Sequence, residues 1–126
     1  MSLILDAGAL VAIERGDREI QALLKGELVA RCVPATHGGV VGQVWRTGGP
    51  RQARLARLLA GVRVEALDDQ LGRRAGALLA RTRRSGVIDA ALVLLASDGD
   101  SILTSDPGDL EPLAAAAGVH VDIVCV

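Results

Sequence analysis

The chain has 126 residues, half of them apolar, and a formal net charge of −1 at pH 7. This length suits a single domain, residues 1–126, and so apolar a composition argues against an intrinsically disordered chain. No apolar run reaches the ~18 residues of a membrane-spanning helix, and the N-terminus lacks the charged start and long apolar stretch of a signal peptide.

Apolar runs bounded by turn residues predict strands, and stretches with apolar residues at helical spacing predict helices. In chain order these are a strand at 3–5, helices at 8–15 and 17–26, a strand at 28–33, helices at 36–45 and 50–59, a strand at 62–67, helices at 68–86 and 90–96, a strand at 101–104, a helix at 105–117 and a strand at 119–126.

Capping and breaking residues set several of these boundaries. Asp17 and Thr36 stand where a helix N-cap is expected, and either Asp68 or Asp69 fills that place before residue 71. Pro34 should end the second strand, and Gly86 should end the helix predicted over residues 68–86. Residues 90–96 are apolar all round, which is typical of a buried helix. Strands that alternate with helices favour a parallel sheet covered on both faces.

Arginine is nearly the only cation of the chain, and much of it falls in the middle of the sequence. Arg51, Arg54 and Arg57 recur every third residue and predict a basic stripe on one helix. Such a stripe would position an RNA backbone without reading its sequence, and a solvated helix face is the plainer alternative. Trp45 is the only aromatic residue, which nearly excludes a stacking platform of the kind that binds single-stranded nucleic acid.

Three aspartates stand where an apolar element ends or begins. Asp6 closes the first strand, Asp89 precedes the buried helix, and Asp106 follows the fourth strand with Asp109 three residues later. If the first and fourth strands are neighbours, Asp6 and Asp106 meet at one edge of the sheet. Carboxylates gathered in a partly buried pocket disfavour each other's charged forms, and a hard divalent ion relieves this repulsion. The pattern therefore favours a Mg²⁺ site able to act on a phosphodiester.

Helix capping is the alternative explanation for three of these acids. Asp106 before Pro107 has the pattern of an N-cap with proline in the first turn, and Asp109 would favour the helix dipole. Asp89 has a similar position at the start of its helix. No helix explains Asp6, and Glu14 with the remaining acids is expected at the surface or at caps.

The motifs together resemble the PIN-domain ribonucleases, and among them the VapC-type toxins of bacterial toxin–antitoxin pairs. The resemblance covers nearly the whole chain and rests on Leu-Ile-Leu-Asp6-Ala, Pro34-Ala-Thr, Val44-Trp45-Arg46, Val87-Ile-Asp89-Ala-Ala and Leu103-Thr-Ser-Asp106-Pro-Gly-Asp109-Leu. It implies a three-layer α/β/α sandwich with a central parallel sheet of about five strands. It further implies a metal-dependent endoribonuclease, a homodimer and a cognate antitoxin, with Asp6, Asp89, Asp106 and Asp109 as acids of a Mg²⁺ (or Mn²⁺) site.

The sequence departs from that family at one site position. The family places a glutamate before the aromatic-basic pair, where this chain has Gln43. An amide still forms hydrogen bonds but brings no negative charge. The chain is therefore predicted to be a ribonuclease toxin that uses Asp6, Asp89, Asp106 and Gln43 for catalysis and Arg46, Arg51, Arg54 and Arg57 for RNA. The alternative is an impaired PIN-fold module that binds RNA or an antitoxin without cleavage.

Other chemistries find little support in the residues. His37 and His120 have no partners at zinc-binding spacing, and phosphate-loop, dinucleotide and serine-hydrolase motifs are missing from the sequence. The haloacid-dehalogenase pattern needs an aspartate where Gly8 stands, and receiver domains need a lysine late in the chain, whereas Lys25 is early. Cys32 and Cys125 are far apart, which favours a reduced cytoplasmic protein.

Overall fold

A computed structural model describes residues 2–84 and 86–126. Within these residues, five strands form one parallel sheet in the order β3-β2-β1-β4-β5. The strands are β1 (Leu3–Leu5), β2 (Ala35–His37), β3 (Arg63–Glu65), β4 (Ser101–Thr104) and β5 (Asp122–Cys125). The neighbouring strands β1 and β4 lie in the middle of the sheet, with Ile4 opposite Ile102 and Leu5 opposite Leu103.

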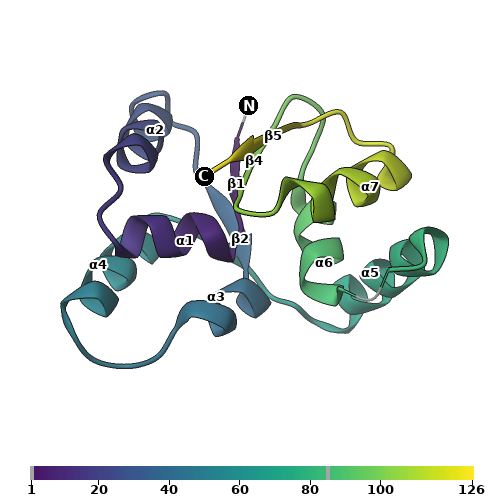
Figure 1. Ribbon diagram of the computed structural model, residues 1–126, viewed down its shortest axis with the longest axis horizontal. Helices are drawn as coiled ribbons and strands as arrows, with labels where there is room; N and C mark the ends of the chain where they lie inside the picture. Colours follow the sequence, from purple (N-terminus) through teal and green to yellow (C-terminus); the bar gives the residue numbers. More distant parts are fainter. Residues whose placement is uncertain (1, 85) are drawn as a thin grey trace.

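Helices cover both faces of this sheet (Figure 1). On one side lie α1 (Ala7–Glu14), α2 (Arg18–Val29), α3 (Gly38–Val44) and α4 (Pro50–Leu59). On the other side lie α5 (Asp69–Thr82), α6 (Val87–Leu95) and α7 (Pro107–Ala117). The three-layer α/β/α sandwich predicted from the sequence is confirmed.

The core lies between the sheet and its two helical layers. All three residues of β1 are buried, as are all four of β4. Helix α6 packs against α5 and α7, and its residues Ala90, Ala91, Leu92 and Val93 have no exposed surface, which explains why it is apolar all round. Each large aliphatic side chain buried in this way stabilises the fold by roughly 1.5–3 kcal/mol.

After the neighbouring strands β1 and β4, the chain enters opposite helical layers. From β1 the chain passes directly into α1, which packs against α2, α3 and α4. From β4 it passes into α7, which packs against α5 and α6. Such a divergence at the carboxyl ends of neighbouring parallel strands opens a crevice, the usual place for a ligand in an open α/β sheet.

The strand predicted over residues 28–33 is wrong. Helix α2 continues through Gly26 to Val29, and Arg31 then turns the chain with a positive φ of 59°. The apolar run fits a helix end as well as a strand, and Val29 is 82% exposed rather than in the core. The second strand, β2, follows Pro34, and it contains Thr36. The cap of α3 is therefore His37, whose side chain accepts a hydrogen bond from the backbone of Gly39.

Other boundaries differ by a few residues from those predicted. Helix α5 ends at Thr82 and not near Gly86, because Arg83 adopts the left-handed conformation. Ser85, which the predicted helix also included, lies outside the described residues. Helix α6 begins at Val87, so that Asp89 is inside its first turn. Strands β3 and β5 are shorter than the runs 62–67 and 119–126 that predicted them.

None of the helices in the described ranges combines the length and the apolar character needed to cross a membrane.

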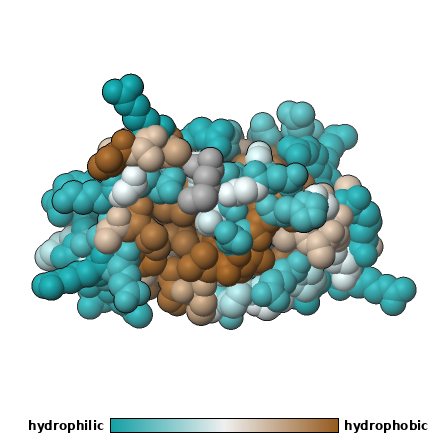
Figure 2. All heavy atoms as spheres, turned by 90° about the horizontal axis from the view of Figure 1, so that it is seen from above, coloured by the Kyte–Doolittle hydropathy of each residue, from teal (hydrophilic) through white to brown (hydrophobic). Residues whose placement is uncertain are grey.

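The surface carries several apolar side chains. Seen from above, one face has apolar atoms gathered toward its middle and polar atoms around them (Figure 2). The exposed large apolar residues are Leu23, Leu28, Val29, Val33, Trp45, Val64, Val87 and Val124.

Candidate functional site

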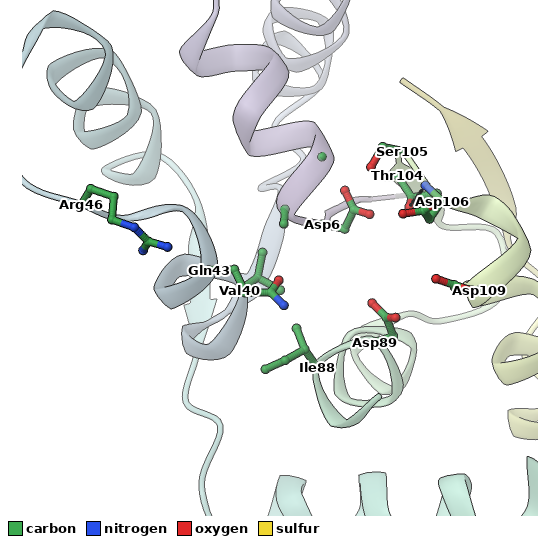
Figure 3. A pocket seen from close by; sticks show the side chains of 12 residues that line it. Asp6, Val40, Gln43, Arg46, Ile88, Asp89, Thr104, Ser105, Asp106 and Asp109 are labelled. Atoms are coloured by element: carbon green, nitrogen blue, oxygen red, sulfur yellow. Dashed lines mark hydrogen bonds between the residues drawn. The ribbon is translucent and has the colours of Figure 1, made fainter. Parts of the chain in front are cut away.

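An open pocket of about 450 Å³ lies where the chain leaves β1 and β4 (Figure 3). The residues around it come from the ends of both strands and from α1, α3, α6 and α7. They are Asp6, Ala7, Gly8, Val40, Gln43, Arg46, Ile88, Asp89, Thr104, Ser105, Asp106 and Asp109. Acids that lie far apart in the sequence thus line one cavity, and Asp6 and Asp106 meet at one edge of the sheet as the strand-end argument predicted.

Asp6 caps helix α1 and also lines the pocket. Its backbone N–H donates to the carbonyl oxygen of Leu103 over 3.1 Å, which continues the β1–β4 pairing to the pocket edge. Its Oδ1 accepts from the backbone N–H of Ala9 over 3.0 Å, so Asp6 is the N-cap of α1. The expectation that no helix explains Asp6 is therefore wrong. The side chain is 9% exposed, and it is the most buried carboxylate of the pocket.

Asp106 and Asp109 enter the pocket from the start of α7. The side chain of Asp106 makes no capping hydrogen bond to α7, so the capping alternative does not account for it. Its backbone N–H instead donates to Oγ1 of the buried Thr104 over 2.9 Å, which fixes the turn after β4. Asp109 lies in the first turn of α7, where a negative charge also suits the helix dipole.

The carboxyl group of Asp89 lies close enough to the other acids of the pocket for their charges to shift its pKa. Burial raises the pKa of its carboxyl above the ordinary value, and the negative charges of Asp109, Asp6 and Asp106 raise it further, while His37 acts in the opposite direction. The N-cap position of α6 belongs to Gly86, so Asp89 is not the cap of that helix. The pocket therefore holds mutually repelling carboxylates, an arrangement that a cation would stabilise.

Gln43 and Arg46 form the opposite wall of the pocket, at the end of α3 (Figure 3). The Arg46 guanidinium donates from Nη1 to the carbonyl oxygens of Trp45, over 2.6 Å, and Gly42, over 3.2 Å. The backbone N–H of Arg46 donates to Oε1 of Gln52 over 2.8 Å. A short chain of hydrogen bonds therefore holds this arginine at the pocket wall opposite the acids.

Gln52 extends that chain of hydrogen bonds into the helical layer. Its side chain is 8% exposed, and its Nε2 donates to Oε1 of Glu14 over 2.9 Å. Glu14, expected at the surface, is instead half-buried and joins α1 to α4. Sequence reasoning missed both residues, because a polar pair from two distant helices leaves no local pattern.

The arginines of α4 lie outside the pocket lining. Arg51 and Arg57 are exposed on the helix surface, whereas Arg54 is half-buried. Nη1 of Arg54 donates to the carbonyl oxygen of Glu14 over 2.9 Å, at the end of α1. The structure thus places Arg46 in the lining of the pocket, across from the acids, and leaves the α4 stripe outside that lining.

The donor atoms of the pocket are oxygens, which suit hard cations. Across the described residues, however, no three His, Cys, Asp or Glu side chains converge closely enough to hold a metal ion directly. Ser105 and Thr104 add hydroxyl groups that sequence reasoning did not single out. The signal that would have found them was a threonine at the end of a buried strand followed by a serine just before Asp106.

Comparison with known proteins identifies the fold. No protein-family model and no curated protein matches the sequence. A chain in the crystal structure of VapBC2 from Rickettsia felis, bound to a DNA fragment from their promoter, is similar with a TM-score of 0.67 at 13% identity. The match covers 98% of this chain and 98% of that chain. The chain therefore has the PIN-like α/β/α fold that its motifs predicted.

Proposed function

We propose that this protein is a divalent-metal-dependent endoribonuclease of the VapC type, the toxin of a type II toxin–antitoxin pair. The observation that carries the proposal is one open cavity lined by Asp6, Asp89, Asp106 and Asp109 at the point where β1 and β4 diverge. The likeness in fold to a chain of the VapBC2 complex supports the toxin class.

The donor set fits a hydrated Mg²⁺ or Mn²⁺ ion better than a fully stripped one. Mg²⁺ usually keeps several waters and takes one or two carboxylates, leaving positions for phosphate oxygens. Carboxylates that line one cavity without converging on a single point suit such binding. The raised pKa of Asp89 supports it further, because a cation bound among these acids would offset the repulsion that contributes to the shift.

The residues divide into groups with different roles. Asp6, Asp89 and Asp106 would hold the ion, and Asp109 and Gln43 would support it through their oxygens. When bound, the ion supplies an activated water and stabilises the charge that develops on the phosphate. Arg46 would hold a backbone phosphate of the RNA at the pocket wall, and Arg51, Arg54 and Arg57 would contact the strand only at a distance from the cut.

The proposed partners follow from the same class. RNA is the substrate, and the activity would be exerted in the cytoplasm. A cognate antitoxin protein and a second copy of this chain are the proposed protein partners. The exposed apolar residues of α2, among them Leu28 and Val29, support protein contacts, because apolar surface of this kind is typical of interaction sites.

The test is cleavage of single-stranded RNA by the purified protein with Mg²⁺. We expect cleavage that EDTA abolishes and that Asp6→Asn lowers by at least about a hundredfold, a loss typical of removing one charged group that stabilises the transition state. Equal cleavage by wild type and Asp6→Asn would refute the assignment of this pocket.

A second candidate function is an impaired module that binds RNA or antitoxin without cutting. Gln43 favours it, because the amide replaces a negative charge that the family places there. Tight RNA binding without cleavage, by wild type and by Gln43→Glu alike, would favour this module over the nuclease.

A further inference from the structure

Arg84 stands beside the acidic pocket on the side away from Arg46. Its Nη1 lies 3.7 Å from Oδ1 of Asp109. Arg84, Gly86, Asp89 and Asp109 line a hollow of about 260 Å³, and the two acids of this hollow also line the acidic pocket. In Figure 3 Asp109 lies across the pocket from Arg46. The acids are thus flanked by a guanidinium on each side.

The end of α5 explains how Arg84 reaches this position. Arg83 adopts left-handed angles, with φ 57° and ψ 31°, and ends the helix. Beyond it, a Cβ added at Gly86 would lie 3.4 Å from Oδ2 of Asp89, which is ordinary van der Waals contact. The chain after the left-handed turn therefore lies close to the acids at Arg84 and at Gly86.

The contact between Arg84 and Asp109 is weak enough to be exchanged. The two side chains are 39% and 60% exposed, and their separation is longer than a good charge-assisted hydrogen bond. Exposed pairs of this kind contribute little to stability. A phosphate offers the planar guanidinium two oxygens, which arginine binds with two parallel hydrogen bonds.

We propose that Arg84 binds a backbone phosphate of the substrate strand, so that RNA crosses the acidic pocket between Arg46 and Arg84. This inference rests on the proposed ribonuclease function and adds to it the path of the strand. It replaces the α4 stripe, which lies outside the pocket, with a contact at the α5–α6 connection as the main basic site beyond Arg46.

The test compares Arg84→Gln with Arg18→Gln, which removes the same charge from an exposed residue of α2 that has no proposed contact with RNA. Both changes are made in the Asp6→Asn protein, with Mg²⁺ present, so that binding is measured without cleavage. The probe is a labelled single-stranded RNA of mixed sequence, titrated by fluorescence anisotropy at several salt concentrations. We expect Arg84→Gln to lower affinity about three- to tenfold and to reduce the slope of log K against log salt by ~0.7, the value for one phosphate contact.

A structural role for Arg84 would give a different set of results. Loss of a cation beside carboxylates should leave Mn²⁺ affinity, measured by calorimetry on the Arg84→Gln protein with Asp6 intact, unchanged or higher. A protein that merely needed Arg84 to hold Asp109 would lose Mn²⁺ affinity together with RNA affinity, which would overturn the proposal. Arg84→Lys should keep most of the salt slope, because the charge remains.

The remaining outcomes separate this inference from the function on which it rests. If wild type cleaves RNA while Arg84→Gln binds it as Arg18→Gln does, the strand path is wrong and the nuclease stands. If wild type neither binds nor cleaves RNA, the proposed function fails, and the role of Arg84 fails with it.

Discussion

His37 donates a hydrogen bond from Nε2 to the carbonyl oxygen of Ile88 over 2.9 Å and so ties the start of α3 to the first turn of α6. Its Nδ1 accepts from the backbone N–H of Gly39 over 3.1 Å. Both ring nitrogens are therefore used by the neutral ring, and protonation of Nδ1 would set two N–H groups against each other. The histidine that the sequence left without a role joins the two helices that carry Gln43 and Asp89.

The first prediction is a loss of stability in mild acid. Burial lowers the pKa of His37 below its ordinary value of 6.5, against the opposing effects of its hydrogen bond to Ile88 and the charge of Asp89. The unfolded chain then binds more protons than the folded one below about pH 6.5, so the free energy of unfolding falls as pH drops, by at most ~1.4 kcal/mol per pH unit. Urea unfolding of the metal-free protein between pH 7.5 and 5.5 measures this fall. His37→Asn should flatten it, whereas His120→Asn, at an exposed histidine, should not.

The second prediction is that Asp89→Asn stabilises the metal-free protein at pH 7 and abolishes RNA cleavage. The pKa of Asp89 is raised by burial and by its neighbouring acids, so the folded state holds this carboxylate at a cost that the amide lacks. We expect a gain of roughly 0.5–2 kcal/mol, the usual range for a single stabilising change. Thermal melting in EDTA measures the gain, and added Mg²⁺ should raise the melting temperature of wild type more than that of the variant. A variant less stable than wild type in EDTA would contradict the inference that Asp89 and its neighbouring acids repel one another.

The third prediction distinguishes two roles of Asp6, as the cap of α1 and as an acid of the proposed metal site. Asparagine caps a helix as well as aspartate does, so Asp6→Asn should change the free energy of unfolding by less than ~0.5 kcal/mol and still lose cleavage. Asp6→Ala should lose cleavage and also about 1 kcal/mol of stability, because the N–H of Ala9 loses its acceptor. Denaturant titration of both variants distinguishes the cap from the chemistry. Equal stability of the two variants would mean that the cap contributes nothing measurable to the free energy of unfolding.

The fourth prediction concerns the missing charge of the pocket. Gln43→Glu should raise the Mg²⁺ affinity and the cleavage rate, because a further carboxylate faces the ion. Gln21→Glu makes the same chemical change on exposed α2 and should alter neither. Calorimetric titration with Mn²⁺ and an RNA cleavage assay provide the measurements. Unchanged binding in Gln43→Glu would place position 43 outside the metal site.

The fifth prediction concerns the contact between α1 and the turn after β4. A Cβ added at Gly8 would lie 2.7 Å from Cβ of Ser105 and 2.8 Å from its backbone nitrogen, both closer than packing allows. Gly8→Ala should therefore cost about 1–3 kcal/mol, and Ser105→Gly in the same chain should recover part of the loss. Gly76→Ala, in the open interior of α5, is the matched control and should stabilise by about 0.4–1 kcal/mol. Equal effects of the two alanines would show that the turn moves freely.

Much of the fold was predictable because its signals are local. Leu3-Ile-Leu before Asp6, and the apolar run that became α6, each specify one kind of buried element. The clustering of Asp6 and Asp106 followed from a single assumption, that β1 and β4 are neighbours, and the sheet order confirms that assumption.

The errors arose where local pattern and tertiary packing disagree. Residues 28–33 are apolar enough for a strand, yet Val29 lies in an exposed helix end. The stripe of Arg51, Arg54 and Arg57 was visible from its spacing, but only the packing of α4 against α1 shows that it lies outside the lining of the pocket. Arg84 was not singled out for RNA, because its approach to Asp109 depends on the left-handed turn at Arg83.

The divergence of α1 and α7 from neighbouring strands means that backbone direction, and no particular side chain, hollows out the pocket. Residues on the outer helices are thus free to be replaced during evolution without filling it, provided that the strand ends keep their acids. The likeness in fold to a chain that is only 13% identical agrees with this tolerance of the helices. Searches for remote relatives of this protein should accordingly weight the positions just after β1 and β4 above the helices that surround them.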